Sequence, residues 1–291
     1  MLEFFDDSSF EYISPIFNNL LALCTEDDVG EVVTLFNQLV SRLKVKFFNT
    51  ANELFMVFVT KILGFVETKN PNRHEAVISD ELRQALTLQK LLFTMLTNLV
   101  QSDLITVFTS SRKKKRANYN YNNNTNKPRE RAPSNLPIPS HAPVNASHLN
   151  KILQVVLEGC GNTNDFSISK ICFLIMGKFV EKWAGTAEGA LPGFNQFVYE
   201  HILKACFTVP MSPDFDLKDA AAVAALNEIC NLQKTILLKC GIEYMAFLNE
   251  KLFPALQLQT HSFASFAQNL QSSNPQDFRK YFKQLVESRK T

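Results

Sequence analysis

Apolar residues recur along most of the chain at spacings of three and four, the pattern of amphipathic helices. In the N-terminal part, four stripes of this kind lie in segments separated by short polar stretches, at 10–24, 32–43, 51–65 and 82–100. Between the third and fourth stripes, the residues TKNPNR at 68–73 predict a loop, because Asn-Pro interrupts a helix.

The same periodicity resumes at His148 and continues to the last residues. Its apolar stripes fall at 152–157, 172–183, 194–206, 226–237, 244–252 and 278–285. Residues 212–216 predict a turn and a cap for a helix starting near Leu217, and Gly241 predicts where that helix ends.

Pairs of predicted helices follow one another about every 40 residues, the period of HEAT-type repeats. Only 9 of the 291 residues are Gly, which favours long helices over strands and turns. We therefore predict an all-α fold, a superhelix or solenoid of HEAT-like repeats. No residue signature repeats with this period, and an irregular helical bundle would give the same pattern.

The helical pattern stops between residues 110 and 147. This segment contains 8 Asn and 5 of the chain's 12 Pro. It has too few apolar residues for their burial to offset the entropy cost of ordering it, so we expect it to be disordered. The predicted organisation is helical repeats at 1–109, a basic Asn- and Pro-rich loop at 110–147, and further helical repeats at 148–291. Residues 111–147 carry a net charge of +7, so the remainder of this +2 chain carries −5.

The sequence gives no sign of catalytic chemistry. It has no Walker-type phosphate loop, no G-x-G-x-x-G and no H-E-x-x-H, and its six cysteines are scattered singly in apolar surroundings. Gly159-Cys160-Gly161 favours a helix end over a phosphate cradle, and His201 on an apolar stripe favours a packing role over a catalytic one. We expect a protein that is not an enzyme, with no metal, no cofactor and buried, reduced cysteines.

Two basic clusters are candidates for binding RNA. The first is the run Arg112, Lys113, Lys114, Lys115 and Arg116, which is followed by Tyr119 and Tyr121 and so combines cations with rings that can stack on bases. The same run could serve as a nuclear localisation signal, or could be a solvated loop that binds nothing specific. The second cluster is Arg279, Lys283 and Lys290, which share one flank of the last predicted helix.

No long apolar segment predicts membrane insertion. The acidic N-terminus lacks a basic region followed by an apolar run, and the stretch from Leu54 to Val66 is broken by Lys61 and is shorter than a membrane span. We expect a soluble intracellular protein.

The second half resembles the C-terminal end of the exportin-T family, the tRNA export receptors of the importin-β superfamily. The resemblance is carried by four ordered segments, namely ICFLIMGKFVEKWAG from Ile171, GFNQFVYEHILKACF from Gly193, the stretch from Phe215 to Gln257, and the closing FRKYFKQLVE. In the first half, residues 35–58 are compatible with the family but less distinctive.

The resemblance implies a HEAT-repeat superhelix that wraps tRNA together with Ran-GTP in the nucleus. It also implies contact with nuclear pore proteins during transit and release of the cargo in the cytoplasm. It also implies that this chain corresponds to the C-terminal portion, without the repeats that bind Ran. The basic segment looks like an insertion relative to the family, so its candidate role in binding tRNA comes from its chemistry alone. The alternative is a helical-repeat carrier or scaffold for protein cargo, in which Arg112–Arg116 is only a localisation signal.

Overall fold

A computed structural model describes residues 10–68, 80–109, 146–186, 190–258 and 260–290 of the chain. Within these ranges the fold is built of helices with no strand, which confirms the predicted all-α class. The N-terminal helices are α1 (Phe10–Leu23), α2 (Val29–Leu43), η2 (Lys44–Phe47), α3 (Phe48–Thr68), α4 (Asp80–Gln101) and η3 (Ile105–Phe108). The C-terminal helices are α5 (Ala146–Cys160), α6 (Phe166–Trp183), α7 (Phe194–Phe197), η4 (Val198–Ile202), α8 (Leu203–Thr208), α9 (Ala220–Phe247), η5 (Leu248–Leu252), α10 (Phe253–Ala255), α11 (Thr260–Gln271) and α12 (Pro275–Lys290).

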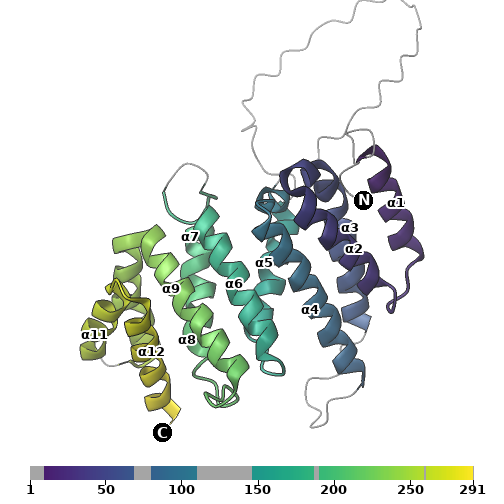
Figure 1. Cartoon of the computed structure of the whole chain (residues 1–291). Coiled ribbons are helices and arrows are strands. Elements are labelled where there is room, and N and C mark those ends of the chain that lie inside the picture. Colours follow the sequence, from purple (N-terminus) through teal and green to yellow (C-terminus); the bar gives the residue numbers. More distant parts are fainter. Residues whose placement is uncertain (1–9, 69–79, 110–145, 187–189, 259, 291) are drawn as a thin grey trace, which may run out of the picture.

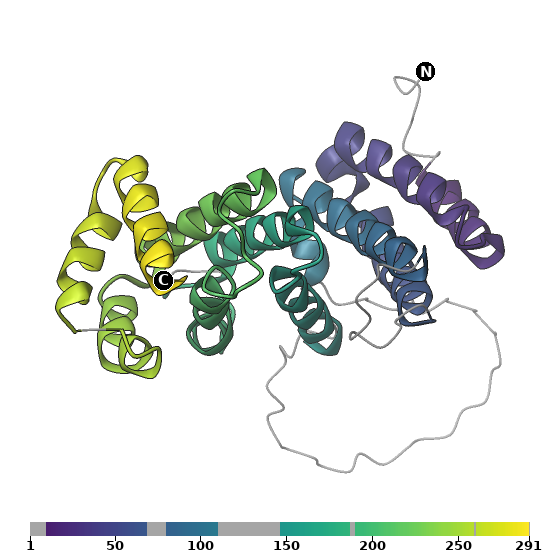
Figure 2. The same ribbon diagram turned by 90° about the horizontal axis from the view of Figure 1, so that it is seen from below.

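The helices stack side by side into an elongated array, with the two ends of the chain at its opposite ends (Figure 1). In one layer α2 packs on α4, α4 on α6, α6 on α9, and α9 on α12. Against this layer lie α3, which contacts α4 and α1, and α5, which contacts α6. Figure 2 shows the two rows of helices from below. Each element contacts mainly its neighbours, as expected for a solenoid of helical repeats.

Aromatic side chains make the core continuous along this array. Near the N-terminal end, the ring centroids of Phe36 and Phe58 lie 4.6 Å apart, and Phe17 lies within 6 Å of both. Farther along, Phe108 in η3 contacts Phe55 in α3 as well as α6, so the two predicted repeat segments share one core. Such aromatic pairs stabilise the fold beyond the area they bury.

Two glycines allow helices to approach or end where the packing requires it. A Cβ on Gly159 in α5 would lie 2.4 Å from Cys172 Sγ and 2.7 Å from Phe93 Cζ, so only Gly lets α5 lie this close to α6 and α4. Gly241, at φ +50°, breaks α9 into two helical parts, which confirms the predicted terminator.

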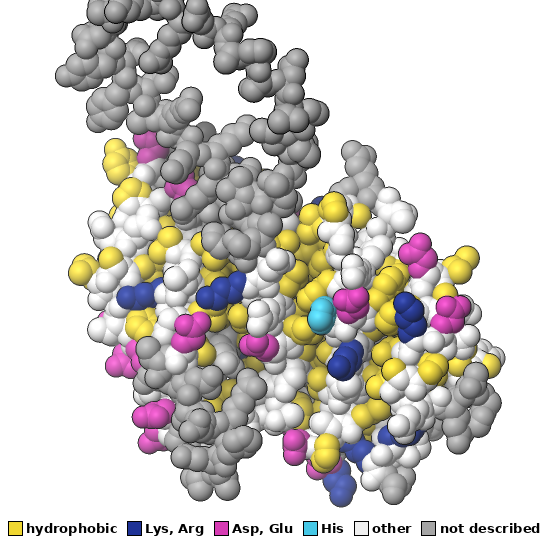
Figure 3. All heavy atoms as spheres, turned by 180° about the vertical axis from the view of Figure 1, so that it is seen from behind, with side chains coloured by type: hydrophobic (Ala, Val, Ile, Leu, Met, Phe, Trp, Pro, Cys, Tyr) yellow, Lys and Arg dark blue, Asp and Glu magenta, His cyan; other side chains and the backbone are white. Residues whose placement is uncertain are grey.

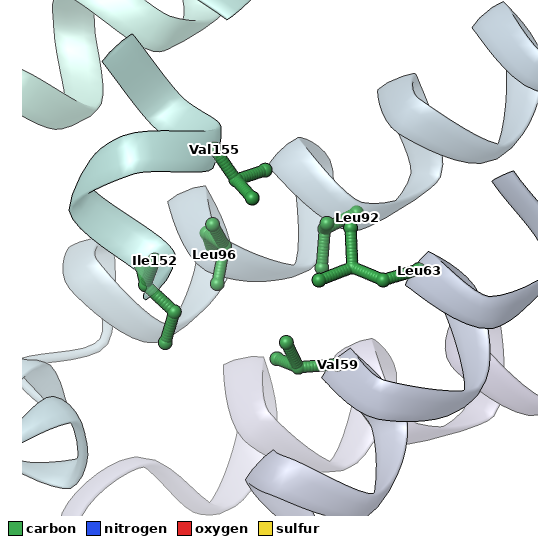
Figure 4. A pocket seen from close by; sticks show the side chains of 6 residues that line it. All are labelled: Val59, Leu63, Leu92, Leu96, Ile152 and Val155. Atoms are coloured by element: carbon green, nitrogen blue, oxygen red, sulfur yellow. The ribbon is translucent and has the colours of Figure 1, made fainter. Parts of the chain in front are cut away.

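At the edge of the core, a small apolar pocket marks the place where α3 and α5 sit over α4. Its empty volume, including the opening to solvent, is about 190 Å³, and aliphatic side chains from these three helices line it (Figure 4): Val59, Leu63, Leu92, Leu96, Ile152 and Val155. The pocket lacks polar groups and therefore offers no chemistry beyond apolar contact.

Other details of the fold agree with or correct the sequence analysis. Helix α9 begins at Ala220 rather than near Leu217, because the Asp219 side chain caps it by accepting a hydrogen bond from the amide of Ala221.

All six cysteines are free and buried, as expected. No helix in the described ranges has the length and apolar character needed to cross a bilayer. The loop expected at 68–73 lies outside the described residues except for Thr68, which ends α3, and so does the predicted loop at 110–147 except for its last two residues, which lie in α5.

Candidate nucleic-acid interface

The basic run Arg112–Arg116 lies outside the described residues, but the element that leads into it is fixed. Phe108, the last residue of η3, packs with its ring centroid 5.3 Å from that of Phe179 and 6.3 Å from that of Trp183, both near the end of α6. Within the same end of α6, Lys178 pairs with Glu181 at 2.8 Å and Lys182 is exposed. The last described residue before the basic run, Thr109, therefore directly follows a phenylalanine that is anchored in an aromatic cluster.

The second cluster of candidates lies on α12, which the chain builds with a strong N-terminal cap. The side chain of Asn274 accepts a hydrogen bond from the amide of Gln276 at 3.0 Å, and Asp277 accepts from Asn274 Nδ2 at 3.0 Å and from Ser272 Oγ at 2.8 Å. One face of the helix buries Phe278, Phe282 and Val286. Phe282 packs edge-on against Phe207 with ring centroids 5.6 Å apart, which fixes α12 against the body of the fold.

Arg279 faces the protein rather than solvent. Its Nη2 donates a hydrogen bond of 2.9 Å to Oδ1 of Asn231 in α9, and its Nε is buried without a partner in the described part of the chain. Nearby, burial raises the pKa of the Cys230 thiol to about 12, and the positive charge of Arg279 offsets part of that rise. This guanidinium therefore has a packing role, with little of it available to a phosphate.

Lys290 is also engaged within the fold. Its Nζ donates to the backbone carbonyl of Phe215 and lies 5.4 Å from the centroid of the Phe215 ring. Desolvation lowers the pKa of Lys290, and Asp216 and Asp214 oppose that shift. The neighbouring Arg289 donates from Nη2 to the carbonyl of Gln257 at 2.7 Å. The last turn of α12 is therefore hydrogen-bonded to two other segments, at Phe215 and at Gln257.

Among the three α12 candidates, Lys283 has its salt-bridge partner on the same helix. It lies 3.9 Å from Glu287 one turn away, and both side chains are about half exposed. Lys280, which was not among the predicted candidates, is also exposed on this helix. The position of Lys280 could have been predicted from the buried stripe through Phe278 and Phe282. Residues next to a stripe residue lie on the flank of the helix, whereas Lys280, two positions from both Phe278 and Phe282, points away from the buried face.

The face seen in Figure 3 does not concentrate positive charge. The face in Figure 3 shows cations and acids scattered singly among apolar and neutral side chains. At the N-terminal end, the first 41 residues contain eight Asp or Glu and no Lys or Arg. Asp28 accepts hydrogen bonds from the backbone and hydroxyl of Thr25 just before α2, and these bonds lower its pKa. The acidic end disfavours contact with nucleic acid.

The described part of the chain also contains no group of three or more His, Cys, Asp or Glu side chains placed to hold a metal ion. His201 is exposed rather than packed in an interface, with its ring 5.2 Å from that of Phe197. The buried thiols of Cys160 and Cys172 have raised pKa values because burial disfavours the thiolate. A raised pKa makes a thiol unreactive.

Comparison with known proteins identifies the family. A family model described as Exportin-T matches residues 141–290, more than half of the chain and all of the helices from α5 onward. The chain belongs to the exportin-T family. Over 279 residues it is 28% identical to the exportin-T of Homo sapiens, covering 96% of this chain and 25% of the human protein. Over 291 residues it is 23% identical to that of Arabidopsis thaliana, covering 99% of this chain and 26% of the plant protein.

The chain therefore spans about a quarter of the length of the exportin-T relatives it matches. It corresponds to the C-terminal portion of the exportin-T architecture, and its stacked helices have the arrangement expected of that family. The similarity extends through the N-terminal helices as well, since the matches to relatives cover nearly all of the chain.

Proposed function

We propose that this protein is part of a tRNA nuclear export receptor, in which its helical array helps to enclose tRNA in cooperation with Ran-GTP. Such a receptor binds and releases cargo and catalyses no reaction. The observation that carries the proposal is the exportin-T match over residues 141–290, which spans the array from α5 to α12.

The architecture is suited to this cargo. A solenoid presents a long surface that can follow the shape of a folded RNA. Proteins recognise duplex RNA mostly through its backbone and 2′-hydroxyls, so a receptor for many tRNAs needs little reading of bases. Cations that could contact phosphates include Arg112–Arg116 in the basic segment and the exposed Lys280 and Lys283 of α12.

The proposed partners and location follow from the same role. The complete receptor binds Ran-GTP through repeats outside this chain, contacts nuclear pore proteins in transit, and shuttles between nucleus and cytoplasm. The present chain contributes the helices from α1 to α12, and the exposed side of α12 is polar.

Binding of radiolabelled tRNA, measured by filter retention with and without Ran-GTP, tests this proposal. We expect retention of tRNA, and a gain in affinity on adding Ran-GTP only when the remainder of an exportin-T chain is supplied. Equal retention of tRNA and of an unrelated acidic polymer would contradict it.

The alternative is a carrier of protein cargo in which Arg112–Arg116 is a localisation signal. Deleting residues 111–147 distinguishes the two. Loss of nuclear entry with tRNA binding unchanged would support the protein-cargo role, whereas loss of tRNA binding supports the proposed one.

A further inference from the structure

The break in α9 at Gly241 carries two exposed apolar side chains. Leu238, shortly before the break, and Ile242, directly after it, are 84% and 87% exposed. Gly241 between them has a φ of +50°, a backbone conformation that favours glycine. The other exposed large apolar side chains in the described ranges lie in α1, α2 and η2, in the N-terminal half of the array. The break in α9 is therefore an apolar surface of its own.

The residues beside the two apolar side chains hold the break in place. Cys240 and Tyr244 are buried, so the chain turns them inward and leaves the two apolar side chains outward. The side-chain oxygen of Asn195 lies 4.0 Å from Cys240 Sγ and accepts a hydrogen bond of 2.8 Å from the amide of Gly185. This bond ties the segment that follows α6 to this part of α9. A surface that is fixed in advance loses little conformational entropy when a partner covers it.

The fold itself makes no use of these two side chains. Single exposed apolar residues are common on protein surfaces and need no explanation. Here two occur within five residues, and Leu237 and Met245 close to them in the chain are only partly buried. Apolar side chains grouped in this way indicate a surface that contacts another macromolecule.

An exposed charge directly follows each of the two apolar side chains, and the two charges have opposite signs. Lys239 follows Leu238, and Glu243 follows Ile242. Neither charge forms a salt bridge within the described part of the chain. We call these four residues together the α9 corner. Because its charges cancel, neither a polyanion nor a strongly basic partner is complementary to it.

We propose that the α9 corner is a contact surface for a second copy of this chain. In a two-fold dimer, a residue that meets a different residue of the other copy does so twice, once in each direction. A two-fold axis beside Gly241 places Leu238 against Ile242 of the second copy, and Lys239 against Glu243 of the second copy. Both apolar side chains are then covered and both charges are paired.

The order of the residues along the corner selects a second copy over other partners, since the same four residues supply both halves of the contact. The corner is much smaller than the roughly 800 Å² that each partner buries in a stable complex, so the dimer is weak and forms at high protein concentration. This inference does not depend on tRNA binding.

Sedimentation velocity of the 291-residue protein, from about 5 to about 500 µM, measures this association in the range expected of weak dimers. The test variant is Leu238→Gln with Ile242→Gln, which removes the apolar contact and keeps good helix formers at both positions. The matched control is Ile16→Gln with Leu23→Gln, because these side chains are 54% and 84% exposed on the distant α1. All four positions are exposed, so both variants should keep the fold, which circular dichroism checks.

Single charge reversals test the pairing itself. In Lys239→Glu and in Glu243→Lys, both charges of the corner have the same sign, so two copies of either variant repel each other. In an equimolar mixture of the two variants, every charge of the corner meets its opposite. The mixture should therefore dimerise where each variant alone does not.

We expect a concentration-dependent dimer of the unchanged protein, and association at least tenfold weaker for the α9 double variant and for each charge reversal alone. The mixture should recover the dimer, and the α1 control should not differ from the unchanged protein. A protein that stays monomeric at every concentration, or a dimer that the α9 variants leave unchanged, would overturn the proposal. Association lost only in the α1 control would overturn it by assigning the contact to α1. Charge reversals that dimerise as well alone as in the mixture would contradict the assigned pairing.

Discussion

Lys290 donates a hydrogen bond from Nζ to the backbone carbonyl of Phe215 and lies 5.4 Å from the centroid of the same residue's ring. These two contacts join the last turn of α12 to the loop that precedes α9, 75 residues earlier in the chain. A lysine in this position holds the end of the array together, so it is poorly placed to bind a phosphate.

Replacing this lysine tests that role. We expect Lys290→Met to lower the free energy of unfolding by about 1 kcal/mol, because it removes a hydrogen bond and a cation–π contact while keeping the aliphatic stem. Urea denaturation followed by the fluorescence of Trp183, the one Trp of the chain, provides the measurement. Lys280→Met is the control, since Lys280 is exposed, and should leave the stability unchanged. A fall in tRNA affinity for Lys290→Met with unchanged stability would return this residue to the RNA-binding surface.

Arg279 gives a second prediction on the same helix. We expect Arg279→Ala to cost about 1.5–3 kcal/mol of stability, because it removes a charge-assisted hydrogen bond to Asn231. Arg279→Lys should recover only part of this, since an ammonium cannot reproduce the planar guanidinium. Denaturant titration of both variants and of Asn231→Ala gives the values. Additive effects of Arg279→Ala and Asn231→Ala in the double variant would show that the pair is not coupled.

Gly159 gives a prediction about close packing between helices. A methyl group here would lie 2.4 Å from Cys172 Sγ and 2.7 Å from Phe93 Cζ, so both side chains would have to move. We expect Gly159→Ala to destabilise the protein by about 1–3 kcal/mol, although Ala favours helices intrinsically. Gly30→Ala is a suitable control because a Cβ there meets nothing within 4 Å. Thermal unfolding compares the two, and equal midpoints would contradict the close approach.

Stability should fall at alkaline pH because buried thiols favour their neutral form. Burial raises the folded-state pKa of Cys230 from 9.0 to about 12, so the unfolded chain loses this proton first as pH rises. The stabilisation that comes from keeping the Cys230 thiol neutral is fully present below pH 9. It is lost as pH rises from 9 toward 12, by up to about 1.4 kcal/mol per pH unit for this group. Urea unfolding at pH 7.5, 9 and 10 under reducing conditions measures it. Cys230→Ala should show a shallower decline, and an identical decline would exclude Cys230 as a cause.

The sequence predicted the helices well because each carries an apolar stripe, and the stripe through Phe278 and Phe282 is buried as expected. It could not predict which flanking cations remain free. Arg279 and Lys290 lie beside that stripe, and their partners, Asn231 and the carbonyl of Phe215, are 48 and 75 residues away in the chain. Such pairings depend on how helices stack, which local periodicity does not determine.

The same limit applied to helix ends and to the exposed stripe of α1. The predicted start of α9 was three residues too early, because several Asp residues precede the helix and each could cap it. The hydrogen bond from the amide of Ala221 identifies Asp219 as the cap. Tyr12 and Ile16 have the same apolar character as the buried Ile13 and Phe17, so composition alone does not separate the packed face of α1 from the open one.

The salt dependence of tRNA binding tests the central claim most directly. Equilibrium affinity should be measured between 50 and 200 mM salt for the wild-type chain and for a variant with all five residues of Arg112–Arg116 replaced by Ala. A receptor that holds tRNA through phosphates predicts a linear decrease of log affinity with log salt, with a slope that is reduced by about 0.7–0.9 for each phosphate contact removed. An affinity that does not change with salt, or a slope unaltered in the variant, would contradict the account.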